Sequence, residues 1–258
     1  MKVVLFCGGL GTRLRAHTDE VPKPLVNIGP RPILWHLMRY YAHFGHTEFI
    51  LCLGHMGDQV KQYFRDYAAE LPNDLAVTED ASEIRLLDNS TIDWKVTFAD
   101  TGLEASIGQR LRAVRHHLQG EEMFLANYSD GLSNLPLNEY LDRVRLEDKI
   151  ASCVRVRPDR SFHTLNVGDD DIVSSIAAAA DSNIWVNGGF FALKQEIFDY
   201  LGENEDLVEE PFQRLIAERQ LLAYPHEDFW ACMDTYKDKK AFDAMESRGD
   251  MPWRLWEH

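Results

Sequence analysis

Apolar runs and amphipathic segments alternate along the first half of the chain. Residues 3–7 form a continuous apolar run, which is typical of a strand buried on both faces. Residues 49–53 and 123–128 repeat this pattern. The segments 33–43 and 58–69 instead place apolar side chains at helical spacing. This succession of strands and helices predicts a parallel sheet with right-handed crossovers.

The pattern changes after residue 149, where strand-like runs follow one another quickly. They cover residues 150–156, 164–167, 172–176 and 185–193, with a polar hairpin turn at 168–171. Helices are expected at 195–201, 209–219 and 237–248, and strands at 221–224 and 230–233. Residues 71–93 are polar and poorly periodic, so we expect short strands at most. We predict an α/β fold: a Rossmann-like, mostly parallel sheet flanked by helices, with a small β-rich region in the second half.

A glycine-rich loop follows the first predicted strand directly. Gly8, Gly9 and Gly11 let backbone N–H groups approach an anion closely, because no Cβ intervenes. Arg13 adds a planar fork of donors, and Lys23 adds a point charge held between two prolines. These residues predict a triphosphate site. The spacing excludes a GxxxxGK[ST] loop and a G-x-G-x-x-G dinucleotide motif, which leaves a glycine-rich turn with solvated charges as the alternative.

Two acidic residues stand directly after predicted strands. Asp130 follows the run at 123–128, and Asp234 follows the run at 230–233. A carboxylate at the carboxyl end of a central parallel strand faces the ligand crevice of such a sheet. Two carboxylates from distant strands suit Mg²⁺, which also takes waters and phosphate oxygens. The alternative for Asp130 is an ordinary Asp-Gly turn.

Composition narrows the possible partners. The net charge of −15 argues against nucleic acid and anionic membranes as partners. The four cysteines are far apart, which disfavours a zinc site and suits reduced, buried thiols. No apolar run approaches 18 residues and no signal segment is present, so we expect a soluble, cytoplasmic protein.

Several motifs resemble the sugar-nucleotide pyrophosphorylases, a nucleotidyltransferase superfamily. The amino-terminal pair is GGLGTRL at 8–14 and PKPLVNIGPRPILWH at 22–36. Within the superfamily the chain is most similar to the glucose-1-phosphate cytidylyltransferases. That similarity rests on DTG at 100–102, YSDG at 128–131, NGGFF at 187–191, FWACMDT at 229–235 and PWRLWE at 252–257. The resemblance implies one nucleotidyltransferase domain over 1–258, with a mainly nucleotide-binding half (1–148) and a mainly acceptor-binding half (149–258).

The resemblance also implies a reaction and the residues that serve it. CMP would pass from CTP to a small phosphorylated acceptor with release of pyrophosphate, in nucleotide-sugar and polysaccharide biosynthesis. Arg13 and Lys23 would be catalytic, and Mg²⁺ would bind Asp130 and Asp234. The implied nucleotide-binding residues are Leu5, Cys7, Gly8, Gly9, Gly11, Thr12, Thr101, Gly102, Gln109, Arg110 and Ser129; the implied acceptor-binding residues are Phe162, His163, Asn187 and Gly189. For Gln109 and Arg110, an exposed amphipathic helix is the alternative. A homo-oligomer is also implied.

The acceptor half departs from the family pattern. The family's Glu-Lys-Pro motif, whose lysine grips the acceptor phosphate, falls on Ala177, Ala178 and Ala179. Its Phe-Gly-x-Leu-Asp stretch reads FHTLN at 162–166. These changes favour an acceptor other than glucose 1-phosphate; neutral drift, with another cation replacing the lysine, is the alternative. Two further alternatives are the same chemistry with UTP or dTTP, and a non-catalytic nucleotide-binding regulatory protein. Asp130 and Asp234 argue against the regulatory protein, because a protein that only binds a nucleotide does not need a pair of metal ligands.

Overall fold

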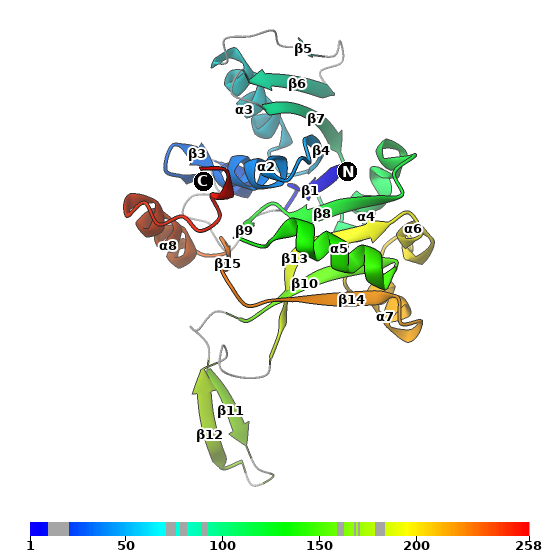
Figure 1. Ribbon diagram of the computed structural model, residues 1–258, viewed down its shortest axis with the longest axis vertical. Coiled ribbons are helices and arrows are strands. Elements are labelled where there is room, and N and C mark those ends of the chain that lie inside the picture. Colours follow the sequence, from blue (N-terminus) through cyan, green and yellow to red (C-terminus); the bar gives the residue numbers. More distant parts are fainter. Residues whose placement is uncertain are drawn as a thin grey trace.

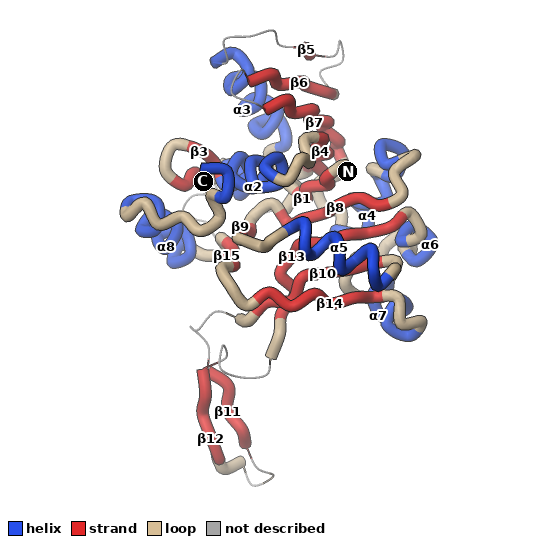
Figure 2. The backbone as a smooth tube through the Cα atoms, in the orientation of Figure 1, coloured by secondary structure: helices blue, strands red, loops and turns tan. Residues whose placement is uncertain are grey.

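A nine-stranded sheet forms the centre of the molecule (Figures 1 and 2). The computed structural model describes residues 1–9, 21–70, 76–77, 82–88, 92–158, 163–167, 169, 171–178 and 184–257. The strands are β1 (Val3–Phe6), β4 (Glu48–Leu53), β5 (Ala76–Val77), β6 (Glu83–Asp88), β7 (Ile92–Asp100), β8 (Met123–Tyr128), β10 (Ala151–Val156), β13 (Val186–Lys194) and β14 (Leu221–His226). Their order is β14-β10-β13-β8-β1-β4-β7-β6-β5. Only β6 and β13 run against the other strands of this sheet, so the predicted mostly parallel sheet is confirmed.

Helices cover both faces of the sheet. One face packs against α2 (Ile33–His43), α3 (Gly57–Glu70), α5 (Leu137–Glu147) and α8 (Tyr236–Ser247); the other packs against α4 (Ile107–Ala113), α6 (Ile197–Tyr200) and α7 (Glu210–Ala217). Consecutive strand residues point to opposite faces, so Phe190 joins the first core and Phe191 the second. None of the helices in the described residues is both long and apolar enough to span a membrane.

Strand β1 lies where the direction of the chain across the sheet reverses. From β1 the chain proceeds to β4 and β7 on one side, and then returns to β8 on the other side. Ligands of such sheets bind at the carboxyl ends of the strands that flank this reversal. Gly8 follows β1 there and Ser129 follows β8. Two short strands, β9 (Gly131–Ser133) and β15 (Trp230–Cys232), pair and bring Asp234 to the same edge.

Most predicted elements match the observed ones. The helix at 33–43 and the strand at 123–128 coincide with α2 and β8. Two expectations were wrong. Region 71–93 contributes β6, a six-residue strand of the main sheet rather than a short strand at most. The helix expected at 195–201 reduces to α6, four residues long.

The second half supplies two different kinds of β structure. Its strands β10, β13 and β14 extend the main sheet. Strands β11 (His163–Val167) and β12 (Val173–Ala178) form a separate antiparallel hairpin, as the turn at 168–171 predicted. This hairpin projects away from the sheet, at the bottom of Figure 1.

The carboxy-terminal segment packs against α2. Trp253 is fully buried, and its Nε1 donates to Nδ1 of His36 at 3.4 Å. The other ring nitrogen of His36 lies 3.1 Å from the carbonyl oxygen of Ile28. Burial, opposed in part by that backbone contact, lowers the pKa of His36 to about 4. The imidazole is therefore neutral in the folded protein at neutral pH, with Nδ1 accepting and Nε2 donating.

Candidate active site

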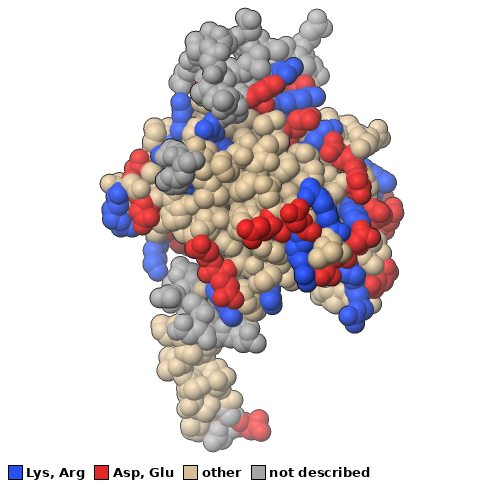
Figure 3. Space-filling model, viewed as in Figure 1, with Lys and Arg blue, Asp and Glu red and all other residues tan. Residues whose placement is uncertain are grey.

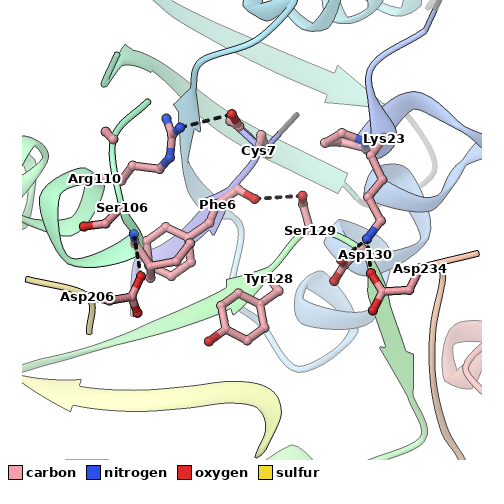
Figure 4. Close-up of a pocket in the computed structure, with 15 residues that line it drawn as sticks. Phe6, Cys7, Lys23, Ser106, Arg110, Tyr128, Ser129, Asp130, Asp206 and Asp234 are labelled. Carbon is pink, nitrogen blue, oxygen red and sulfur yellow. Dashed lines mark hydrogen bonds and ion pairs between the residues drawn. The ribbon is translucent and has the colours of Figure 1, made fainter. Parts of the chain in front are cut away.

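A cavity of about 380 Å³ opens at the carboxyl ends of β1 and β8 (Figure 4). Its walls come from the loop after β1, the segment around Lys23, the start of α4, the end of β8 and two acidic loops. The lining residues are Phe6, Cys7, Gly8, Gly9, Lys23, Pro24, Ala105, Ser106, Ile107, Arg110, Tyr128, Ser129, Asp130, Asp206 and Asp234. The volume suits a small ligand such as a nucleotide.

Lys23 joins the two acids that the sequence singled out. Its Nζ lies 2.5 Å from Oδ2 of Asp130 and 2.6 Å from Oδ1 of Asp234. The three residues come from a 3-10 turn, η2 (Lys23–Leu25), and from the ends of β8 and of β15. Burial disfavours the charge of Lys23, but the two carboxylates outweigh burial and raise the pKa of Lys23 above its usual value. The ammonium group is therefore firmly charged.

The same two carboxylates fit a divalent cation. Asp130 and Asp234 each place an oxygen against a single cationic atom, so they can converge on one ion. Within the described part of the chain, no group of three or more His, Cys, Asp or Glu side chains is placed to hold a metal. Among the described residues, these two carboxylates could hold such an ion. Mg²⁺ accepts this arrangement because it retains waters and takes phosphate oxygens.

Arg110 is buried beneath the loop that follows β1. Its Nη1 donates to the oxygens of Leu53, Thr101 and Gly102, and its Nη2 donates to the carbonyls of Gly8 and Leu103. Four of these acceptors are backbone carbonyls at strand ends, so the guanidinium ties β1, β4 and β7 together. In this structure Arg110 supports the glycine loop from below.

Three more of the residues expected to bind the nucleotide have structural roles. Thr101 donates from its hydroxyl to the carbonyl of Leu53. Gln109 forms a capping box with Ser106 at the start of α4, which satisfies two backbone N–H groups. The Gln109 amide also donates to Asn204 at 3.2 Å. Gly102 has a positive φ of 100°, which favours glycine at this turn.

The floor of the cavity is formed by the ends of β1 and β8. Ser129 donates from Oγ to the carbonyl of Phe6 at 2.8 Å, which links the two strands. Cys7 is buried, and burial raises the pKa of its thiol to about 12. This thiol is therefore protonated and unsuited to act as a nucleophile. Leu5 is fully buried in the core and does not line the cavity.

The residues expected at the acceptor divide into two groups. Asn187 approaches the hydroxyl of Tyr128 at 3.5 Å, and Gly189 packs so tightly on the Tyr128 ring that a Cβ there would lie 2.4 Å from it. This group borders the cavity through Tyr128. His163 lies instead on the projecting hairpin, opposite Ala178, and does not line the cavity. Gly11, Thr12, Arg13, Phe162 and Ala179 lie outside the described residues.

Sequence reasoning missed Tyr128 and Asp206 as cavity residues. Tyr128 stands in the YSDG motif, in which the serine and the aspartate that follow it are the residues that indicate a ligand site. Asp206 belongs to an acidic loop between α6 and α7, and no motif marks it. Its oxygens accept from the backbone N–H groups of Ile107 and Val208, each at 3.3 Å. Burial, together with the charges of Asp206 and Asp130, raises the pKa of Tyr128.

Known proteins resemble the chain over its whole length. A Bacillus subtilis protein named "Probable glucose-1-phosphate cytidylyltransferase" is 35% identical over 258 residues, covering 99% of this chain and 100% of the relative. The glucose-1-phosphate cytidylyltransferase of Salmonella typhimurium is 34% identical over 260 residues, covering 100% of both chains. The sequence-based resemblance to these enzymes is thereby confirmed.

Solved structures support the fold. HddC from Yersinia pseudotuberculosis superposes with a TM-score of 0.65 at 20% identity, covering 95% of this chain and 99% of that chain. The inositol-1-phosphate CTP transferase from T. maritima gives a TM-score of 0.64 at 13% identity, covering 95% and 94%. The family model described as "Nucleotidyl transferase" matches residues 2–247. This chain, with its cavity at the reversal point of a mostly parallel sheet, belongs to the nucleotidyl transferase family.

Proposed function

We propose that the protein transfers CMP from CTP to a sugar 1-phosphate or a related small phosphorylated acceptor and releases pyrophosphate. The observation that carries this proposal is the contact of Lys23 with both Asp130 and Asp234 at the cavity edge, beside the glycines that follow β1. The names of the cytidylyltransferase relatives support CTP as the donor.

The proposed reaction needs charge neutralisation and positioning more than proton transfer. An acceptor phosphate oxygen is already anionic, so it attacks the α-phosphorus of CTP directly. A new P–O bond forms while the bond from the α-phosphorus to the oxygen that bridges it to the β-phosphorus breaks. Pyrophosphate leaves with the electron pair of that broken bond. Gly8 and Gly9, with Gly11, would cradle the triphosphate, and Arg13 would stabilise the leaving pyrophosphate. Lys23 would contact the α-phosphate and the acceptor.

Asp130 and Asp234 would hold a magnesium ion. When bound, Mg²⁺ supplies positive charge that stabilises the negative charge of the reacting phosphates. Lys23 then stays close to the same carboxylates, where its ammonium can donate to phosphate oxygens. Without the ion, the two acids raise the pKa of Lys23 and keep it charged.

Pyrophosphate release tests the proposed function. We expect release with Mg²⁺ and CTP once a suitable acceptor is present, from a panel that includes glucose 1-phosphate. Asp234→Asn should abolish release. Glu227→Gln, which removes a similar charge from an exposed position in the same segment, should not. CTP binding without release for any acceptor would favour the regulatory alternative.

We also propose that the protein forms a homo-oligomer through the β11–β12 hairpin. Leu165 and Ile176 are cross-strand partners there, and they are 54% and 65% exposed. Figure 3 shows almost no charged side chains on this hairpin except near its tip. Exposed apolar surface of this kind marks an interaction site. Sedimentation of a Leu165→Asp, Ile176→Asp double variant should show smaller particles than the parent protein.

We propose that the protein acts in the cytoplasm, in nucleotide-sugar and polysaccharide biosynthesis, with CTP and the acceptor as small-molecule partners. The alanines at 177 and 178 lie on the projecting hairpin. The acceptor panel should contain glucose 1-phosphate together with other sugar phosphates and polyol phosphates. It then also tests whether the alanines in place of the family's Glu-Lys-Pro motif alter the choice of acceptor.

A further inference from the structure

The cavity has a second acidic end, away from the Lys23 cluster. Asp206 lies across the cavity from Asp130 and Asp234, and the rings of Phe6 and Tyr128 lie between these ends (Figure 4). A triphosphate site gains nothing from an added negative charge near the phosphates. A carboxylate at the far end therefore calls for a ligand group that donates hydrogen bonds.

Asp206 is held in place by the start of α4. Its two oxygens accept from the backbone N–H groups of Ile107 and Val208. The neighbouring Glu205 carbonyl accepts from Oγ of Ser106 at 2.8 Å. A Cβ on Gly108 would lie 2.4 Å from that same carbonyl, so glycine is what permits the close contact. The loop and the helix start are thus locked together, and the carboxylate position is fixed.

The carboxylate keeps capacity for a further partner. Each oxygen has two lone pairs, and each accepts one backbone N–H among the described residues. No described lysine or arginine forms an ion pair with Asp206, in contrast to Asp130 and Asp234. Asp206 is therefore a negatively charged acceptor in the cavity wall rather than half of a described salt bridge.

We infer that Asp206 selects the nucleotide base by accepting a hydrogen bond from the exocyclic amine of cytosine. This inference rests on the proposed use of a nucleoside triphosphate. With the phosphates at the Lys23 end, a nucleoside extends past the ring of Phe6 toward Asp206. Cytosine presents an amino donor at C4, whereas uracil and thymine present a carbonyl oxygen that a carboxylate repels. Asp206 thereby favours CTP over UTP and dTTP.

Equilibrium binding without acceptor tests the inference independently of catalysis. Calorimetry with Mg²⁺ would compare CTP, UTP, dCTP and a CTP analogue that lacks the exocyclic amine. For the parent protein we expect UTP and the analogue to bind about tenfold or more weakly than CTP, and dCTP to bind nearly as well as CTP. Equal binding of CTP and the analogue would overturn the inference, even if the protein proves to be an active transferase.

Asp206→Asn supplies the second arm. Its amide can donate to a C4 carbonyl, so the ratio of CTP to UTP affinity should fall about tenfold. Glu203→Gln is the matched control, because this exposed residue of the same loop does not line the cavity. If Asp206→Asn lowered the affinity for all nucleotides by the same factor, Asp206 would have a structural role only. If the parent protein binds CTP more tightly than dCTP and Asp206→Asn removes that difference, Asp206 contacts the ribose instead. Both results would overturn the inference.

Discussion

The guanidinium of Arg110 occupies the space that a side chain on residue 8 would need. A Cβ on Gly8 would lie 2.1 Å from Nη1 of Arg110, closer than any real contact. We predict that Gly8→Ala lowers the free energy of unfolding by about 1–3 kcal/mol, because the loop or the buried arginine must shift. Urea denaturation would measure this change.

Gly9→Ala is the control for that experiment. A Cβ on Gly9 would meet no described heavy atom within 4 Å, so the stability should change little. If both alanines had the same effect on stability, the contact between Gly8 and Arg110 would not explain the glycine at position 8.

Arg110→Lys should be destabilising although it keeps the charge. The guanidinium reaches five oxygens from two nitrogens, and a single ammonium has three donors on one atom. The variant would leave buried carbonyls without donors, at a cost of about 2–4 kcal/mol. Arg112→Lys is a matched control in the same helix, since the exposed Arg112 donates to the carbonyl of Leu201. A similar melting temperature for both variants would contradict the supporting role of Arg110.

The sequence predicted the parts of the site that depend on strand ends. Gly8 after β1 and Asp130 after β8 meet because neighbouring parallel strands end at one edge of the sheet. Their meeting with Asp234 required the pairing of β9 with β15, which is a long-range contact with no local signal. The sequence indicated that Asp130 and Asp234 meet only because each of them follows an apolar, strand-like run.

The burial of Arg110 and the position of Asp206 in the cavity wall could not be predicted from the sequence. An arginine in an amphipathic helix appears solvent-exposed, yet Arg110 is 3% exposed because several strand ends converge around it. Asp206 reaches the cavity only because the α6–α7 loop packs on α4, which depends on tertiary packing between segments about 100 residues apart in the chain.

Lys23→Ala should change the response of the protein to magnesium. Without the ammonium, Asp130 and Asp234 repel each other, and a divalent ion relieves that repulsion. We predict that Mg²⁺ raises the melting temperature of the variant by more than it raises that of the parent protein. Turnover should fall by orders of magnitude, because the variant lacks the group that contacts the phosphates.

A double variant tests whether the extra stabilisation by Mg²⁺ comes from the repulsion between Asp130 and Asp234. Lys23→Ala combined with Asp130→Asn carries one carboxylate fewer at the cluster, so the extra stabilisation by Mg²⁺ should disappear. Equal thermal shifts with Mg²⁺ in the parent and in Lys23→Ala would argue against Asp130 and Asp234 as metal ligands.

His36 should make the stability depend on pH in the acid range. Its pKa is about 4 in the folded protein and about 6.5 when unfolded. The unfolded chain therefore binds more protons between these values, so the free energy of unfolding falls as the pH falls from about 6.5 to about 4.

Replacement of His36 by glutamine removes the titrating group while keeping an amide that can donate and accept. We predict that His36→Gln loses less stability than the parent protein over this interval, by on the order of 2–3 kcal/mol. Urea denaturation at several pH values would show it, with the exposed His43→Gln of the same helix as the control. Parallel pH profiles for the parent and His36→Gln would mean that other groups, such as the carboxylates or His46, cause the acid loss of stability.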